Sequence, residues 1–174
     1  MEVLMQVMSI QVDKNDFEMR DYFCVLRESV LEAYTGIIQG LKGTDNKPHP
    51  DINIIQGHVP LILKYVVQTA QDSDLSESTV TSCAGLIGDL CLAFGAPLLP
   101  FILEDNIVMP MLMDGKKSTQ HRTKSTCSWA LREIKALRQA TTNTITPGVN
   151  NVTSSQPANN NNNIQFASNF SNTV

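Results

Sequence analysis

The sequence predicts an all-α protein made of amphipathic helices joined by short turns. Apolar residues recur at intervals of three and four through most of the first 140 positions, which is the spacing of one face of an α-helix. The alternation of apolar and polar residues that a half-buried strand needs is missing. Hydrophobic residues make up 42% of the chain, which is enough to form a core.

Residues 1–140 are expected to form one helical domain. Its six helical segments have approximate bounds 2–11, 17–42, 51–71, 76–95, 97–113 and 117–139. The first segment begins at the first residue without a capping group and carries Val3, Leu4, Val7 and Met8 on one face. We therefore expect a fragment of a longer protein, or the product of a truncated gene, with an apolar edge that a preceding repeat would cover.

The second segment, 17–42, is predicted to be one long helix. Its buried stripe consists of Phe23, Leu26, Val30, Tyr34, Ile37 and Leu41. Asp21, Glu28 and Glu32 follow at i, i+7 and i+11, so they stack on the opposite face. Taken alone, this acidic face is either a solvated surface or a binding surface, and the first is the simpler interpretation.

Prolines and a glycine delimit the next segment. Pro48 and Pro50 exclude a helix from the loop before 51–71, and Pro60 is tolerated only in a first helical turn. Gly57 should therefore separate a short turn from a longer helix, which ends in a polar turn.

The segment 76–95 is the one around which the rest of the chain is organised. Its apolar stripe consists of Val80, Cys83, Ala84, Ile87, Leu90, Cys91 and Phe94. Ser82, Gly85, Gly88 and Asp89 lie off this stripe. Because glycine inside a helix costs about 1 kcal/mol relative to alanine, the two glycines imply either a tightly packed neighbouring helix or a groove that binds a partner.

The last two segments differ in regularity. Residues 97–113 are apolar but interrupted by prolines, which predicts a broken helix pair. Residues 117–139 form a regular helix whose inward stripe is Thr123, Cys127, Ala130, Ile134 and Leu137. Trp129 lies roughly 130° from the centre of that stripe at about 100° per residue. It is therefore either an edge residue of the core or an exposed binding anchor.

The composition changes after residue 140. Residues 141–174 consist mainly of Asn, Ser and Thr, include five consecutive asparagines at 159–163, and carry no charged side chain. Such a segment buries too little apolar surface to offset the entropy of ordering, so we expect a disordered tail.

Charge is distributed unevenly along the chain. Residues 1–114 hold 6 Lys/Arg and 16 Asp/Glu, a net charge of −10, whereas residues 115–140 hold 7 and 1, a net charge of +6. An acidic body argues against nucleic acid as the main partner and favours a basic protein segment.

No run of about 20 apolar residues is present for a membrane span. The start of the chain also lacks the basic region and cleavage site of a signal peptide.

Nothing in the sequence predicts catalysis or metal binding. His49, His58 and His121 are isolated, and no metalloprotease, nucleophile-elbow or phosphate-binding motif is present. We therefore expect no enzyme activity, no metal and no cofactor. The 4 cysteines lie in or beside helical stripes without a C-x-x-C pair, and we interpret them as reduced core residues of a cytosolic or nuclear protein.

Helix pairs recur along the chain. Ala33, Ala84 and Ala130 occupy similar places in their helices and are 51 and 46 residues apart, a period close to that of HEAT repeats. The pattern V-x-x-C-A-x-x-I-G-x-L also resembles the second helix of a HEAT repeat, with Thr81 in place of the usual Arg. We therefore expect a HEAT-repeat superhelix, in which antiparallel helix pairs bury their stripes against neighbouring pairs.

Three separated segments resemble the C-terminal end of importin beta, the karyopherin family of nuclear import receptors. They are RESVLEAYTGIIQGLKG (27–43), CAGLIGDLCLAFG (83–95) and WALREIKALRQA (129–140), in the order and spacing of the family. The resemblance covers about residues 1–140 and leaves the tail outside. It implies a HEAT superhelix with an inner face. The helices on that face would be 17–41, 76–95 and 116–139.

The resemblance also implies a protein partner. C-terminal repeats of the family wrap the basic importin-beta-binding helix of importin alpha, so the expected partner is that helix or a basic cargo. Acidic residues and tryptophans of the inner helices make the contacts in the family. The positions that fit this role here are Trp129, Glu28, Glu32, Asp21 and Asp89.

The same resemblance implies a location in the cell and a distribution of other binding sites along the full receptor. Sites for the Ran GTPase and for nucleoporins would lie in repeats that precede this segment. The expected location is the cytoplasm, the nucleus and the nuclear envelope. A generic HEAT-repeat scaffold that binds another protein partner is the alternative function.

Overall fold

The structure is a computed structural model that describes residues 4, 6–7, 17–42, 51–72, 75–104 and 106–144. All regular secondary structure in these residues is helical, which confirms the predicted all-α class. Leu4, Gln6 and Val7 of the first expected helix, 2–11, are helical, and its other positions lie outside the described residues. The tail from residue 145 onward, expected to be disordered, also lies outside them.

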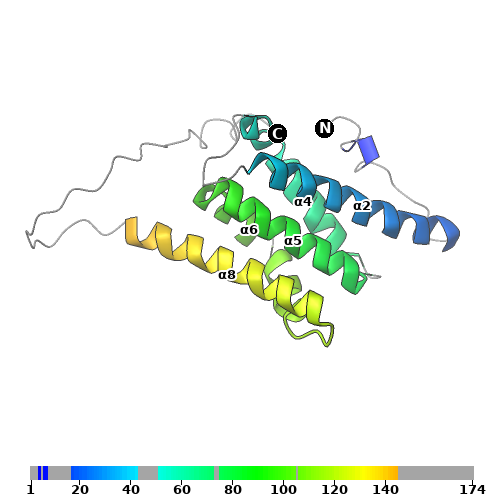
Figure 1. Cartoon of the computed structure of the whole chain (residues 1–174). Coiled ribbons are helices and arrows are strands. Elements are labelled where there is room, and N and C mark those ends of the chain that lie inside the picture. The colour runs from blue at the N-terminus through cyan, green and yellow to red at the C-terminus, as the bar shows by residue number, and fades with distance from the viewer. Residues whose placement is uncertain are drawn as a thin grey trace, which may run out of the picture.

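Three long helices run side by side in one layer: α2 (Phe17–Leu41), α5 (Glu77–Phe94) and α8 (His121–Thr144) (Figure 1). Glu28 of α2 bonds Thr79 of α5, and Gln39 further along α2 bonds Asp89 further along α5. Contact positions thus advance together, so the two helices are parallel. The same holds for α5 and α8, where Thr81 meets Thr123 and Gly88 meets Trp129.

Shorter helices cover the other side of this layer. In chain order they are α3 (Ile52–Gln56), α4 (Val59–Ala70), the 3₁₀ turn η1 (Ala96–Leu98), α6 (Leu99–Leu103) and α7 (Val108–Gly115). Figure 1 shows α4 and α6 behind the three long helices. This two-layer arrangement of helix pairs is that of a HEAT-type solenoid, in which each pair packs on its neighbours.

The helix expected over 51–71 is divided at Gly57. Pro60 has no amide hydrogen and its ring would clash with the carbonyl of residue 56 in a continuous helix, so it is accommodated in the first turn of α4. The segment 97–113 is broken into η1, α6 and α7. Asn106 there has φ 54, a left-handed conformation that no helix interior contains.

The last helix is displaced relative to its predicted bounds of 117–139. It begins at His121, because the preceding residues form turns in which the Lys117 amide bonds the Asp114 carbonyl at 2.8 Å. It ends at Thr144, so the first positions assigned to the disordered tail are helical. The hydroxyls of Thr141 and Thr142 donate to the carbonyls of Leu137 and Arg138, one turn earlier and both at 2.9 Å, so these side chains bond back to their own helix.

Helix α5 is enclosed by its neighbours. Of its 18 residues, ten are buried: Thr79, Thr81, Cys83, Ala84, Leu86, Ile87, Gly88, Asp89, Leu90 and Cys91. Burial is the largest cause that raises the pKa of Cys83 and of Cys91 to about 12 each. These thiols are therefore protonated core groups, as the sequence predicted for their packing, and all 4 cysteines are free.

The pairing of α5 with α8 differs from the repeat spacing found in the sequence. Thr81 and Thr123 face each other across 42 residues, whereas α2 and α5 pair across 51 and 50 residues. Ala130 therefore lies about one helical turn beyond the position opposite Ala84. The register of α8 against α5 is set by the side chains that face each other across the two helices. The spacing of 46 residues between Ala84 and Ala130 in the sequence could not show it.

None of the described helices is by itself long and apolar enough to cross a bilayer. Among pairs of helices in the described residues, one bent pair, Ala96–Leu103 and Val108–Gly115, which turns by 92°, reaches that length and hydropathy when taken together. Its apolar residues Leu98, Ile102 and Leu112 are fully buried in the protein.

Candidate partner-binding face

The side of the three-helix layer that the shorter helices leave uncovered is the candidate site, and we call it the free face. Its residues recur every three or four positions along each helix, as one side of a helix requires. On α2 they are Glu18, Asp21, Val25, Ser29, Glu32 and Gly36. On α5 they are Ser78, Ser82, Gly85, Asp89 and Leu92, and on α8 Arg122, Ser125, Trp129, Arg132 and Ala136.

Asp89 lies on the free face but is not available to a partner. Its exposed fraction is 3%, because Gln39 of α2 and Lys42, which directly follows α2, cover it. The Gln39 amide donates to Asp89 Oδ2 at 2.8 Å, and Lys42 Nζ lies 3.8 Å from Oδ1. The prediction that Asp89 projects toward a partner is therefore wrong. The sequence correctly predicted the side of α5 on which Asp89 lies. It could not show that side chains from another part of the chain cover the carboxylate.

Glu28 binds the beginning of α5 and is partly buried. Its Oε1 accepts hydrogen bonds from the hydroxyls of Ser76 at 3.0 Å, Ser78 at 2.5 Å and Thr79 at 2.8 Å. Burial raises the pKa of the Glu28 carboxyl, but these three hydrogen bonds outweigh it and the pKa lies below 4.5. The carboxylate also faces the positive end of the α5 dipole, so its contacts hold α2 to α5.

Asp21 and Glu32 are the predicted acidic residues that the structure leaves exposed. Both lie on the free face of α2, and among the described residues neither takes part in an ion pair. Their negative charge is therefore accessible to a cationic partner.

Trp129 combines packing with partial exposure. An added Cβ at Gly88 would lie 2.3 Å from Trp129 Cζ3, so the indole packs directly on the backbone of α5 where no side chain intervenes. At Gly85 the nearest atom is Thr126 Cγ2, at an ordinary 3.9 Å. At Gly88, therefore, α8 packs closely against α5. A tightly packed neighbouring helix was one of the two interpretations of Gly85 and Gly88. The remainder of the half-buried indole borders the free face.

The free face of α8 is basic, a feature that was not among the predictions from the sequence. Arg132 lies one turn after Trp129 and Arg122 two turns before it, and both are exposed. Residues 122, 125, 129 and 132 are spaced by three and four positions, so the helical period of the sequence is the signal that places both arginines on the side of Trp129.

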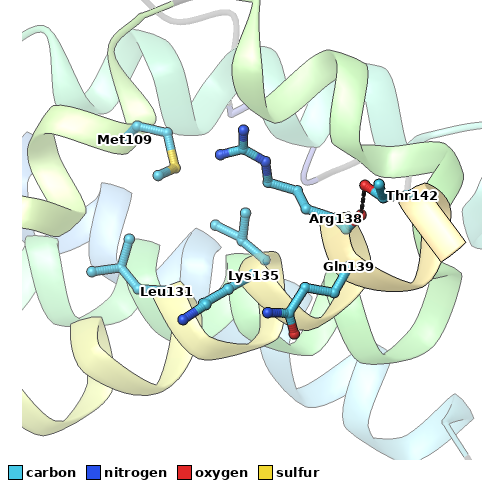
Figure 2. A pocket seen from close by; sticks show the side chains of 7 residues that line it. Met109, Leu131, Lys135, Arg138, Gln139 and Thr142 are labelled. Atoms are coloured by element: carbon cyan, nitrogen blue, oxygen red, sulfur yellow. Dashed lines mark hydrogen bonds between the residues drawn. The ribbon is translucent and has the colours of Figure 1, made fainter.

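A separate cleft of about 630 Å³ lies at the outer edge of α8, on the side away from α5. It is lined by Met109, Leu131, Ile134, Lys135, Arg138, Gln139 and Thr142. Figure 2 shows the Arg138 guanidinium extending toward Met109, with Lys135 and Gln139 extending the other way. No lining residue is a carboxylate, cysteine or histidine, so the cleft offers contacts for binding and lacks a pair for acid–base chemistry.

Metal ligands are not assembled in the part of the chain that the structure describes. No group of three or more His, Cys, Asp and Glu residues there could hold a metal ion.

Comparison with known proteins relates the chain to one family. Residues 1–116 match the family model described as importin subunit beta-1-like, TPR repeats. Importin subunit beta-1 of Schizosaccharomyces pombe is 33% identical over 142 residues, covering 80% of this chain and 16% of the relative. Importin subunit beta-1 of Saccharomyces cerevisiae is 30% identical over 128 residues, covering 71% of this chain and 14% of the relative.

A solved structure agrees in fold. The crystal structure of importin beta in an ammonium sulfate condition superimposes with a TM-score of 0.69 at 28% identity. The match covers 77% of this chain and 15% of that one, so the chain spans about a sixth of the length of its relatives.

Proposed function

Because the chain belongs to the importin subunit beta-1-like family, we propose that its free face binds a basic helical segment of a partner protein in nuclear import. The segment would be the importin-beta-binding helix of importin alpha or a basic stretch of a cargo. The protein would act in the cytoplasm, at the nuclear envelope and in the nucleus, as a binding module without catalytic activity.

The arrangement of Asp21, Glu32 and Trp129 on one face carries this proposal. Exposed carboxylates attract Lys and Arg side chains and accelerate encounter with a basic helix. A partly exposed indole supplies the apolar contact that commonly dominates binding energy. Small residues on α5, among them Ser82 and Gly85, leave room for a helix to approach the layer closely.

The first experiment uses Trp129 as its own reporter, because it is the only tryptophan in the chain. The purified chain is titrated with a helical Arg/Lys-rich peptide while indole emission is recorded at low and at moderate salt. We expect a saturable change in emission and an affinity that falls as salt rises. A peptide of equal length and helicity with Gln in place of Lys and Arg is the control.

Variants then separate the charges from the scaffold. Replacing Asp21 and Glu32 by Lys should slow association and weaken its salt dependence, measured by stopped-flow with a labelled peptide. Glu104→Lys reverses an exposed charge between α6 and α7, away from the free face, and should leave binding unchanged. Equal binding of the basic and Gln peptides would reject the proposal and favour a HEAT-repeat scaffold for another partner.

A further inference from the structure

Charge on the free face changes sign from one edge to the other. Helix α2 presents the exposed carboxylates Glu18, Asp21 and Glu32. Helix α8 presents the exposed guanidinium groups Arg122 and Arg132. The face is therefore acidic at α2 and basic at α8, although the chain as a whole carries a net charge of −4.

The middle helix contributes almost no charge to this face. Asp89, the only charged free-face residue of α5, is covered by Gln39 and lies near the ammonium group of Lys42. Around it the free face of α5 consists of Ser78, Ser82, Gly85 and Leu92. A neutral strip of mainly small residues thus separates the acidic strip from the basic one.

The two arginines are not neutralised by neighbouring carboxylates. No ion pair among the described residues includes Arg122 or Arg132. Glu133, the only acid of α8, is partly buried toward α5, near Cys91. Arg132 lies three residues after Trp129, so a ligand group that contacts the indole comes within reach of this positive charge.

A partner helix of ordinary length can reach both strips. Neighbouring helices pack about 8–10 Å apart, so α2 and α8 are separated by about 16–20 Å. A helix rises 1.5 Å per residue, so about 11–13 residues cross the layer. Lys or Arg at one end of such a helix would meet α2 while the other end lies over Trp129.

From this charge distribution we infer that the partner is a bipolar helix, with Lys/Arg at the end over α2 and Asp/Glu at the end over α8. The inference rests on the proposed function and specifies its ligand. A uniformly basic helix lying across the face would bring cations against Arg132 and Arg122, where like charges repel. Carboxylates at that end would instead pair with the guanidinium groups, which bind carboxylates in bidentate geometry.

The test compares three helical peptides of equal length that cross the layer. The first has bases at one end and acids at the other, the second has the same residues in mixed order, and the third carries bases only. Affinity is measured by fluorescence anisotropy of the labelled peptides. We expect the bipolar peptide to bind about tenfold more tightly than the mixed one, the effect of one well-placed charge pair.

Charge reversal at α8 gives the sharper result. Arg132→Glu should weaken the bipolar peptide about five- to tenfold and tighten the all-basic peptide. Arg122→Glu should act in the same direction. Lys135→Glu makes the same change in charge at the outer edge of the helix, so it should change neither affinity more than about twofold. Circular dichroism of each variant verifies that the helices are retained.

Orientation is tested by a photo-crosslinker at the acidic end of the bipolar peptide, which should attach to α8. Attachment to α2 would overturn the inference. The inference would also be overturned if the bipolar and all-basic peptides bound equally tightly and Arg132→Glu changed neither affinity. In that case the proposed binding of a basic helix would still hold. Failure of all three peptides to bind would instead reject the proposed function itself.

Discussion

At the scale of single residues, Gly88 and Trp129 depend on each other. The indole of Trp129 occupies the space in which any residue other than glycine at position 88 would place its Cβ. Trp129 therefore packs at the edge of the core, one of the two interpretations that its position off the stripe allowed, and substitutions there change packing as well as the free face.

Gly88→Ala should lower the free energy of unfolding by about 1–3 kcal/mol, because the new methyl group overpacks against the indole. Urea denaturation followed by circular dichroism measures the change. Gly85→Ala is the matched control. It meets Thr126 at an ordinary contact distance and should be neutral or stabilise by up to about 1 kcal/mol through helix propensity. If both variants had the same stability, the close contact would not exist.

Glu28 should make stability depend on pH. Its pKa is lower in the folded protein than the ordinary 4.5, so its contribution is present above that value and disappears as pH falls through the folded pKa. Glu28→Gln should therefore destabilise the protein near neutral pH, with the difference from the wild type shrinking below pH 4.5. Glu32→Gln, which alters an exposed carboxylate, should show no such convergence in denaturation curves recorded at both pH values.

At the scale of elements, α5 is fixed between two parallel neighbours by polar contacts as well as apolar packing. The hydroxyl oxygens of Thr81 and Thr123 lie 3.0 Å apart and both residues are buried. This pair sets the register of α8 against α5 in a core where few other polar groups are present.

Thr81→Val should cost about 1–3 kcal/mol, because it leaves the buried Thr123 hydroxyl without its partner. The double variant Thr81→Val, Thr123→Val removes both hydroxyls and should recover much of that loss. Urea denaturation of the single and double variants measures the coupling. Strictly additive losses would show that the two hydroxyls do not interact.

At the scale of the whole molecule, the solenoid exposes large apolar side chains on its first long helix, α2. Tyr22 is 60% and Val25 64% exposed, and both lie on the N-terminal half of α2. Large apolar side chains that are exposed close together favour association, so these two residues are candidates for a contact between copies of the chain.

We predict that the isolated chain self-associates and that Tyr22→Lys reduces the association. Sedimentation velocity over a range of protein concentrations measures it. Leu92→Lys changes another exposed apolar residue, at the end of α5, and should leave the association unchanged. A monodisperse wild-type monomer at high concentration would contradict the prediction.

The sequence alone determined the class of the fold and the family. Periodicity of three and four residues identifies helices without reference to their neighbours, because each helix has its own buried stripe. Prolines marked the breaks near Gly57 and within 97–113 because a missing amide acts locally. The same local logic placed Asp21, Glu28, Glu32, Asp89 and Trp129 opposite the apolar stripes of their helices.

Only the tertiary structure decided which of those residues remain accessible. Asp89 is covered by Gln39 and Lys42, Glu28 is bonded to the start of α5, and Trp129 packs on Gly88. Each of these outcomes depends on side chains from a neighbouring helix, about 40 to 50 residues distant in sequence. A helical period fixes the direction of a side chain, whereas its burial depends on the register in which the next helix packs.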